Sequence, residues 1–323
     1  MSKFSDFGNR LYSGEQSINF VGRRKLWYTI ASVVIAISIV VPIAKGGFNI
    51  GIDFRGGSEF RVPGITDSNS QIAKDAVHSV LPNEEPVITT IGGDTLRIQT
   101  AQLTDAQSKA IYAALLKGYN KTEKEVTKSF IGASWGSDIT GKAINGLIWF
   151  LVLAAVLMTA YFRTLKMSVA ALIALAHDLV ITAGIYGITG FEVTPAAVIG
   201  FLTILGYSLY DTLVVFDKIR ENTVEVEFSQ TYTFAERVNL AVNQTLVRSI
   251  NTSIVAVLPV GSILFIGAYV LGAGTLRDIA LSLFVGILVG TYSSIFIAPT
   301  AYTQMREGEA KYKKAAEKVL AAR

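Results

Sequence analysis

Six long stretches of this sequence are almost free of charge, and each is long enough to cross a lipid bilayer as a helix. A span needs about 20 mainly apolar residues, because the hydrocarbon layer is about 30 Å thick. The third stretch contains His177 and Asp178, and the fourth contains Asp211. The stretches are residues 26–44, 143–162, 167–191, 193–216, 249–276 and 279–305.

The composition agrees with a membrane protein. Of the 323 residues, 51% are hydrophobic and 17% are charged, which is outside the usual range of soluble domains. The expected fold class is therefore an α-helical integral membrane protein with six transmembrane helices.

Basic residues near the span ends predict the orientation, because Lys and Arg are retained in the cytoplasm. They precede the first span at Arg23, Arg24 and Lys25, separate the second and third at Arg163 and Lys166, and recur in the tail 306–323. Both termini, with the N-terminal segment 1–25, are thus expected in the cytoplasm. These clusters account for the net charge of +4 as orientation signals and lipid contacts. No nucleic-acid partner is expected, since no basic stripe alternates with aromatic residues.

A polar segment, residues 45–141, separates the first two spans and is predicted to fold outside the cytoplasm. Its pattern predicts strand 49–62, helix 68–81, a hairpin of strands 87–91 and 95–100, helix 104–117 and strand 124–131. Thr104 and Gln107 have capping-box spacing, and the hairpin turn contains Gly92 and Gly93. The order βαββαβ is the ferredoxin-like arrangement.

The remaining spans form a predicted five-helix region, residues 143–305. One cytoplasmic segment within it, residues 218–248, is mixed in charge and expected to be partly helical at the membrane surface. The sequence has no second copy of this unit, although transporters often have two related halves. We therefore expect a partner that supplies the other half.

Asp178 and Asp211 are the strongest candidates for chemistry. A charged group at mid-membrane costs about 2.5–3.5 kcal/mol on insertion scales, so it normally faces protein or water and marks an ion or proton path. Each has polar neighbours at helical spacing, which predicts that the two spans share a polar interface. These supporting residues are Thr203, Tyr207, Ser208 and Thr212 on the fourth span and Thr182 on the third. The alternative is polar contact between helices, worth about 0.6 kcal/mol each.

Arg248 heads the fifth span, with Gln244 on the same face. If it reached Asp211, its charge would lower the pKa of that carboxyl, and its departure would raise it. Such a pair would be a switch in the proton path. The alternative is an interfacial anchor. His177 points about 100° away from Asp178 around the helix and is expected to be packed or hydrogen-bonded.

Glycines and serines suggest two structural features. Small residues recur every four positions on the sixth span and predict close packing against another helix, at Ser282, Gly286, Gly290 and Ser294. Gly56 and Gly57, with Asp53 nearby, suggest either a hinge between the external domain and the membrane or a strand bulge.

Enzymatic and metal sites are not expected. The chain has no cysteine and two histidines, which argues against an ordinary zinc site. GSDITGKA (136–143) has Walker-A spacing but ends in Ala143 where a hydroxyl is required. The Gly-x-Gly-Asp motif of intramembrane aspartyl proteases is absent around Asp178 and Asp211. We expect neither an ATPase nor a hydrolase site, no catalytic residues, no metal and no cofactor, with protons as the coupling ion.

Five ordered motifs together resemble the SecF family of the resistance-nodulation-division superfamily. They are GIDFRGG (51–57), AHDL (176–179), GYSLYDTLVVFDKIREN (206–222), NQTLVRSINTS (243–253) and FIGAYVLGAGTLRDIALSLFVGILVGTYSSIFIA (265–298). Tyr210 departs from the family pattern, which has Asn before the aspartate, so the hydrogen bonding around Asp211 is expected to differ.

The resemblance implies a function. SecF proteins pair with SecD in the bacterial cytoplasmic membrane, beside the SecYEG channel and with YajC. The pair is thought to use the proton gradient to draw preproteins outward after SecA has used ATP, with Asp211 and Arg248 in the proton path. Two alternatives stay open. One is a half-unit of a proton-driven small-molecule or lipid exporter, and the other is a passive assembly subunit for SecD.

Overall fold

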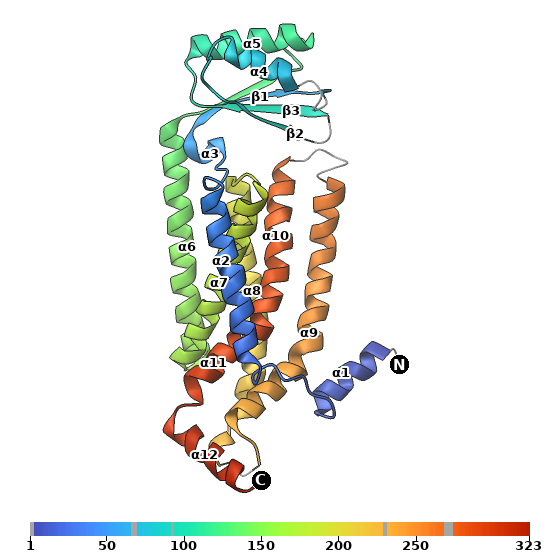
Figure 1. The fold of residues 1–323 in the computed structure, drawn as a ribbon, viewed down its shortest axis with the longest axis vertical. Coiled ribbons are helices and arrows are strands. Elements are labelled where there is room, and N and C mark those ends of the chain that lie inside the picture. The colour runs from blue at the N-terminus through green and yellow to red at the C-terminus, as the bar shows by residue number, and fades with distance from the viewer. Residues whose placement is uncertain (1–2, 66–69, 92–93, 229–230, 268–273) are drawn as a thin grey trace.

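A bundle of long helices carries a small α/β domain at one end and both chain termini at the other (Figure 1). The computed structural model describes residues 3–65, 70–91, 94–228, 231–267 and 274–323. Within these ranges, six helices are long and apolar enough to cross a membrane, which confirms the predicted number of spans.

The spanning helices begin and end at other residues than most of the predicted uncharged stretches. They are α2 Arg24–Ala44, α6 Ala133–Phe162, α7 Leu165–Thr189, α8 Pro195–Thr223, α9 Phe234–Ser262 and α10 Gly274–Tyr292. Two short π-helices, η3 Ile263–Gly267 and η4 Ser293–Ile297, follow α9 and α10, and α11 Ala298–Arg306 continues the last span. Because α6 begins at Ala133, the external domain ends before that residue, earlier than the predicted end at residue 141.

The connection between α8 and α9 differs from the prediction. Residues 218–248 mainly form the ends of these two helices, with only the short η2 Val226–Phe228 between them. Thr233 caps α9 through a capping box with Glu236, which starts the helix well before the apolar stretch. The segment is therefore an extension of the bundle.

The small domain contains a four-stranded antiparallel sheet in the order β2-β3-β1-β4. Its elements are β1 Gly57–Val62, α4 Ser70–His78, β2 Val87–Ile91, β3 Thr95–Thr100, α5 Asp105–Tyr119 and β4 Thr127–Ile131. The two helices cover the sheet face away from the bundle (Figure 1). Phe60, Leu96, Ile98, Ile111 and Leu115 are fully buried between these layers.

The expected first strand, residues 49–62, is wrong in its first half. Ile52–Arg55 form the short helix α3, and the strand begins at Gly57. Gly56 and Gly57 have φ values of 76° and 154°, and a Cβ on Gly57 would lie 2.6 Å from the Thr100 carbonyl oxygen. Only glycine fits this change from helix to strand.

Two local predictions in this domain have different outcomes. The capping box of Thr104 and Gln107 is present at the start of α5. The hairpin glycines Gly92 and Gly93 lie outside the described residues.

The N-terminal segment folds back on the bundle, which the sequence did not predict. Helix α1 Lys3–Ser13 lies beside α9, and the chain after it is held by two asparagines of that helix. Asn243 accepts a hydrogen bond from the Ile18 amide at 2.8 Å, and Asn239 accepts one from the Phe20 amide at 2.8 Å. A further unpredicted helix, α12 Ala310–Ala321, ends the chain.

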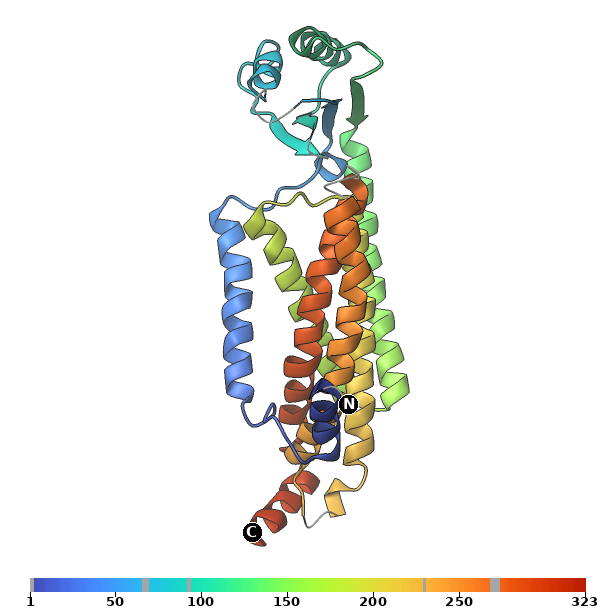
Figure 2. The ribbon, with the colours of Figure 1, turned by 90° about the vertical axis from the view of Figure 1, so that its right-hand side faces the viewer.

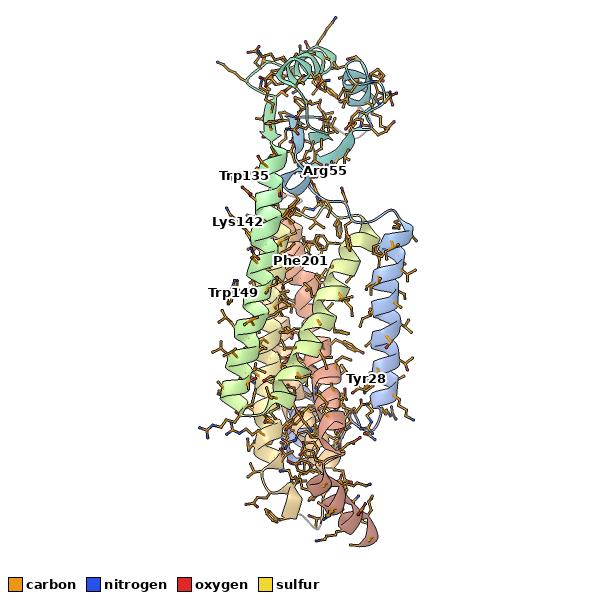
Figure 3. All side chains as sticks on the ribbon, turned by 90° about the vertical axis from the view of Figure 1, so that its left-hand side faces the viewer. Tyr28, Arg55, Trp135, Lys142, Trp149 and Phe201 are labelled. Atoms are coloured by element: carbon orange, nitrogen blue, oxygen red, sulfur yellow. The ribbon has the colours of Figure 1, made fainter. Side chains whose placement is uncertain are left out.

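Helices α2 and α6 lie at the outside of the bundle (Figure 2). On α6, Trp135, Lys142 and Trp149 point away from the other helices (Figure 3), and Trp149 is 65% exposed. A large apolar side chain so exposed on a spanning helix is expected to face lipid.

Helices α8 and α10 approach closely because glycines of one helix lie opposite side chains of the other. A Cβ added to Gly286 would lie within 3.0 Å of three atoms of Ile204, and one on Gly290 would lie 3.0 Å from the Ser208 Cβ. On the turn of α10 before Gly286, Ser282 fills the space beside Gly200. This pattern is typical of close packing between spanning helices.

We predict that Gly286→Ala lowers stability by about 1–3 kcal/mol, because the new methyl group overpacks against Ile204. Gly141→Ala on α6 is the control, since a Cβ there meets no atom within 4 Å. Thermal unfolding of both variants in the same detergent tests this. An unchanged melting temperature for Gly286→Ala would contradict the tight α8–α10 contact.

Candidate functional site

The Asp211 carboxylate lies inside the bundle, where it is 5% exposed. The Ser249 hydroxyl of α9 donates a hydrogen bond to its Oδ1 at 2.8 Å. The Ser294 hydroxyl of η4 donates one to Oδ2. Asp211 therefore joins α8 to two other helical segments.

The Asp178 carboxylate is also buried, at 2% exposure. Its Oδ2 accepts hydrogen bonds from the Ser208 hydroxyl of α8 at 2.5 Å and the Ser293 hydroxyl of η4 at 2.8 Å. Its Oδ1 lies 3.1 Å from Nδ1 of His177, the preceding residue. Three donors can thus satisfy this carboxylate without water.

Consecutive serines connect the two carboxylates. Ser293 bonds to Asp178 and Ser294 bonds to Asp211, and both belong to the π-helix η4. Single π-turns inside α-helices are rare and are often found at functional sites. A change in the charge of either carboxylate would therefore act on the same turn of the last span.

The predicted supporting residues are only partly at this site. Ser208 contacts Asp178 directly. Thr212, the residue that follows Asp211, is buried. The Tyr207 hydroxyl donates to Ser253, one turn beyond Ser249 on α9, at 3.4 Å.

Three other residues proposed for the interface do not contact either carboxylate. Thr203 is exposed and bonds back to the Ile199 carbonyl at 2.8 Å. The Thr182 hydroxyl is buried without a partner among the described residues. Gln244 instead accepts from Asn222 at 2.8 Å and donates to the Tyr12 carbonyl at 3.1 Å, near the termini.

Arg248 is not brought to Asp211 in this structure. Its side chain is exposed, and the described residues include no ion pair or hydrogen bond between it and Asp211. Ser249, the next residue, takes that position instead. The expected direct switch is therefore replaced by a serine contact.

Sequence reasoning missed Ser249 and Ser293 and gave Ser294 only a packing role. Each is a serine within an apolar span. Because buried hydroxyls need hydrogen-bond partners, such a serine is a sequence signal for a polar contact inside the bundle. Their partners could not be assigned without the helix arrangement. Gly286 and Gly290 do lie in the contact with α8.

A second polar cluster lies between the sheet and the ends of α8 and α10. Arg97 forms an ion pair with Glu192, and the Gln99 amide donates to Glu192 at 2.9 Å and to Glu59 at 3.0 Å. The Thr194 hydroxyl, which caps α8, donates to Asp278 of α10 at 2.9 Å. A cavity of about 570 Å³ lies among these residues. We call this cluster the junction.

Asp53 lines the junction cavity on the short helix α3. Burial raises the pKa of its carboxyl, and the nearby Glu59 carboxylate raises it further. Backbone hydrogen bonds between Gly51 and Val193 at 3.0 Å, and between Val193 and Asn49 at 2.8 Å, fix this segment to the loop before α8. The domain is thus attached to the bundle through both side chains and backbone.

In the described part of the chain, no three His, Asp or Glu side chains are grouped closely enough to hold a metal ion.

Comparison with known proteins identifies the family. The model of the protein export membrane protein SecD/SecF, C-terminal family matches residues 111–308. Protein translocase subunit SecF of Streptomyces coelicolor is 44% identical over the whole chain and 86% of its own length. SecF of Mycobacterium tuberculosis is 40% identical over 93% of this chain and 70% of its own length.

A solved structure has the same fold. The crystal structure of SecDF, a translocon-associated membrane protein from Thermus thermophilus, aligns with 90% of this chain at a TM-score of 0.75 and 30% identity. This chain spans 39% of that longer SecDF chain. With its six apolar helices, the chain is a multi-pass membrane protein, and it belongs to the SecF family of protein translocase subunits.

Proposed function

We propose that this chain works with a SecD partner and uses the proton-motive force to assist late stages of Sec-dependent preprotein translocation. The observation that carries the proposal is the pair of buried carboxylates, Asp178 and Asp211, bonded to consecutive serines. Ionisable groups inside a membrane bundle are expensive and typically serve proton or ion movement.

The available energy suits a conformational step. One proton crossing 100 mV releases about 2.3 kcal/mol. A pH difference of one unit adds about 1.4 kcal/mol per proton. Together these amounts exceed the net contribution of a typical hydrogen bond to stability, about 0.5–1.5 kcal/mol. Protonation can therefore rearrange contacts such as those of Ser293 and Ser294.

Helix α10 provides a mechanical route from the carboxylates to the sheet domain. At one end its Asp278 accepts from Thr194 at the junction, and at the other it continues into Ser293 and Ser294. When Asp211 gains a proton, the hydrogen bond that it accepts from Ser294 weakens, because a neutral acid is a weaker acceptor than a carboxylate. A shift of α10 would then reach the junction and move the sheet domain.

The proposed SecD contact is the exposed side of α8 and α9. Thr203 and Arg248 are exposed there, and Tyr210 is 55% exposed although it precedes the buried Asp211. Because Arg248 is exposed on this side, it would complete the proton path at the boundary with SecD. The SecDF chain of Thermus thermophilus, which is longer than this one, supports such a partner.

The full assembly would include the SecYEG channel, YajC, a translocating preprotein and the lipid bilayer. The chain would lie in the bacterial cytoplasmic membrane with both termini in the cytoplasm. Its βαββαβ domain, with the ferredoxin-like element order, would then face the other side. No enzymatic site, cofactor or nucleic acid takes part in this proposal.

Two other functions are less well supported. An exporter half-unit would need larger porter domains than the single small domain between α2 and α6. A passive assembly subunit would need only polar contacts between helices, and it would tolerate a neutral residue at Asp211. The experiment below separates the passive subunit from proton coupling.

We predict that Asp211→Asn abolishes the stimulation of preprotein export by an imposed proton gradient, because the amide cannot exchange a proton. The measurement uses vesicles that contain this chain with its SecD and SecYEG. Asp217→Asn is the matched control, since Asp217 lies on the same helix but is exposed. Retention of gradient-stimulated export in Asp211→Asn would favour the passive subunit.

A pH-dependent effect is predicted at the junction. Because the folded state raises the pKa of Asp53, its ionised form is disfavoured on folding. The cost is absent below the unfolded pKa of about 4 and appears as pH rises through the folded pKa. Asp53→Asn should therefore raise the melting temperature at about pH 7, and this gain should disappear as pH falls toward about 4.

Asp75→Asn on α4 is the control for this prediction, because Asp75 is exposed and far from the junction cavity. A gain for Asp53→Asn that is equal at both pH values would show that ionisation of Asp53 is not its cause.

A further inference from the structure

His177 is a buried imidazole, and within the described part of the chain only one of its two nitrogens has a hydrogen-bond partner. Its side chain is 4% exposed, Nδ1 lies 3.1 Å from Oδ1 of Asp178, and the ring stacks on Tyr292 with centroids 5.7 Å apart. Nε2 is buried without a hydrogen-bond partner among the described residues. A buried polar atom left unpaired costs about 1–3 kcal/mol, so a ligand for Nε2 is expected.

A cavity of about 380 Å³ between α2 and α7 offers such a ligand. His177, Tyr28 and Ser32 supply its polar lining. Water occupies about 30 Å³ per molecule and needs two to four polar partners. The cavity is large enough for several waters, and three polar groups are there to bind them.

The cavity lies toward the end of the bundle away from the sheet domain. Figure 3 shows Tyr28 near that end of α2. Arg24, one turn earlier on α2, forms an ion pair with Glu307 at 2.5 Å. Water in the cavity would thus lie between Asp178 and a charged surface at the end where both termini lie.

We propose that Asp178 exchanges its proton with water in this cavity through His177. This inference rests on the proposed proton coupling and adds a route and a proton-transfer residue to it. In the loaded state, the Asp178 carboxyl donates its O–H to Nδ1, and Nε2 carries the single N–H proton of the neutral imidazole. The Asp178 proton moves to Nδ1 while the Nε2 proton passes to water.

The products are the Asp178 carboxylate, a neutral imidazole with Nδ1–H and one hydronium ion, so charge and protons balance. The reverse step loads the pair from the cavity. The other titratable side chains facing the ring are Tyr292 of α10 and Tyr28 of α2, and Asp211 is connected through Ser294 and Ser293.

The variant His177→Asn tests the route. Its amide nitrogen can take the place of Nδ1 and still donate to Asp178, but it has no second nitrogen facing the cavity. Proton flux into vesicles containing the chain and its SecD should fall about tenfold or more in this variant. Assembly with SecD should be unchanged. An unchanged flux would overturn the proposal.

Nitrogen NMR gives a second readout that does not depend on flux. The chain has two histidines, so ¹⁵N-histidine labelling of the full chain in lipid nanodiscs reports only His177 and His78, and His78 of the sheet domain is the internal reference. We expect Nε2 of His177 to exchange with water and its titration to change in Asp178→Asn. Protection of Nε2 from water, or a titration unaffected by Asp178→Asn, would contradict the route.

The two proposals fail in different ways. If Asp211→Asn lowers the flux and His177→Asn does not, the His177 route is wrong and proton coupling stands. If neither variant differs from wild type, proton coupling itself is wrong. In that case the NMR experiment still decides whether His177 connects Asp178 to cavity water.

Discussion

The arrangement of the bundle depends on keeping two carboxylates away from lipid. Each would cost about 2.5–3.5 kcal/mol at mid-membrane if it had no protein environment. The structure meets this cost with hydroxyl groups from other helices, since Asp211 bonds to Ser249 and Ser294 and Asp178 bonds to Ser208 and Ser293. These bonds require α8 and α10 to lie close together, and their facing glycines allow that approach.

The last span therefore has two roles that are physically linked. Its π-turn holds both carboxylates, and its opposite end contacts Thr194 at the junction with the sheet domain. A rigid helix transmits a displacement over its whole length, whereas a flexible connection would absorb it. The junction adds the ion pair of Arg97 with Glu192 and the half-buried Asp53, so the domain is attached at several points. In the proposed mechanism, a proton bound at the carboxylates would act on the sheet domain through this helix, without direct contact between the carboxylates and the domain.

Much of the architecture could be predicted because apolar length and turn chemistry are local signals. The six spans, the order of the sheet elements and the capping box at Thr104 follow from such patterns. The helix ends, α3 and the docking of α1 on Asn239 and Asn243 could not be predicted, because they depend on tertiary contacts.

The same limit applies to prediction of the site. An aspartate within an apolar span marked Asp178 and Asp211, but two of their serine partners, Ser293 and Ser294, lie in a π-turn that shifts the helical register. Arg248 was paired with Asp211 from span order alone, and the structure places Ser249 there.

The most direct test of this account is infrared spectroscopy of the protonation states of Asp178 and Asp211. The chain would be labelled with ¹³C-aspartate and reconstituted with its SecD partner, and spectra would be recorded with and without an imposed proton gradient. The account predicts carboxylic C=O bands that appear when the gradient is imposed, one missing in Asp178→Asn and the other in Asp211→Asn. Each substitution should also shift the remaining band, because the two groups share the Ser293–Ser294 turn. If no band appears, or if the bands are independent, the carboxylates are structural and do not couple protons to movement.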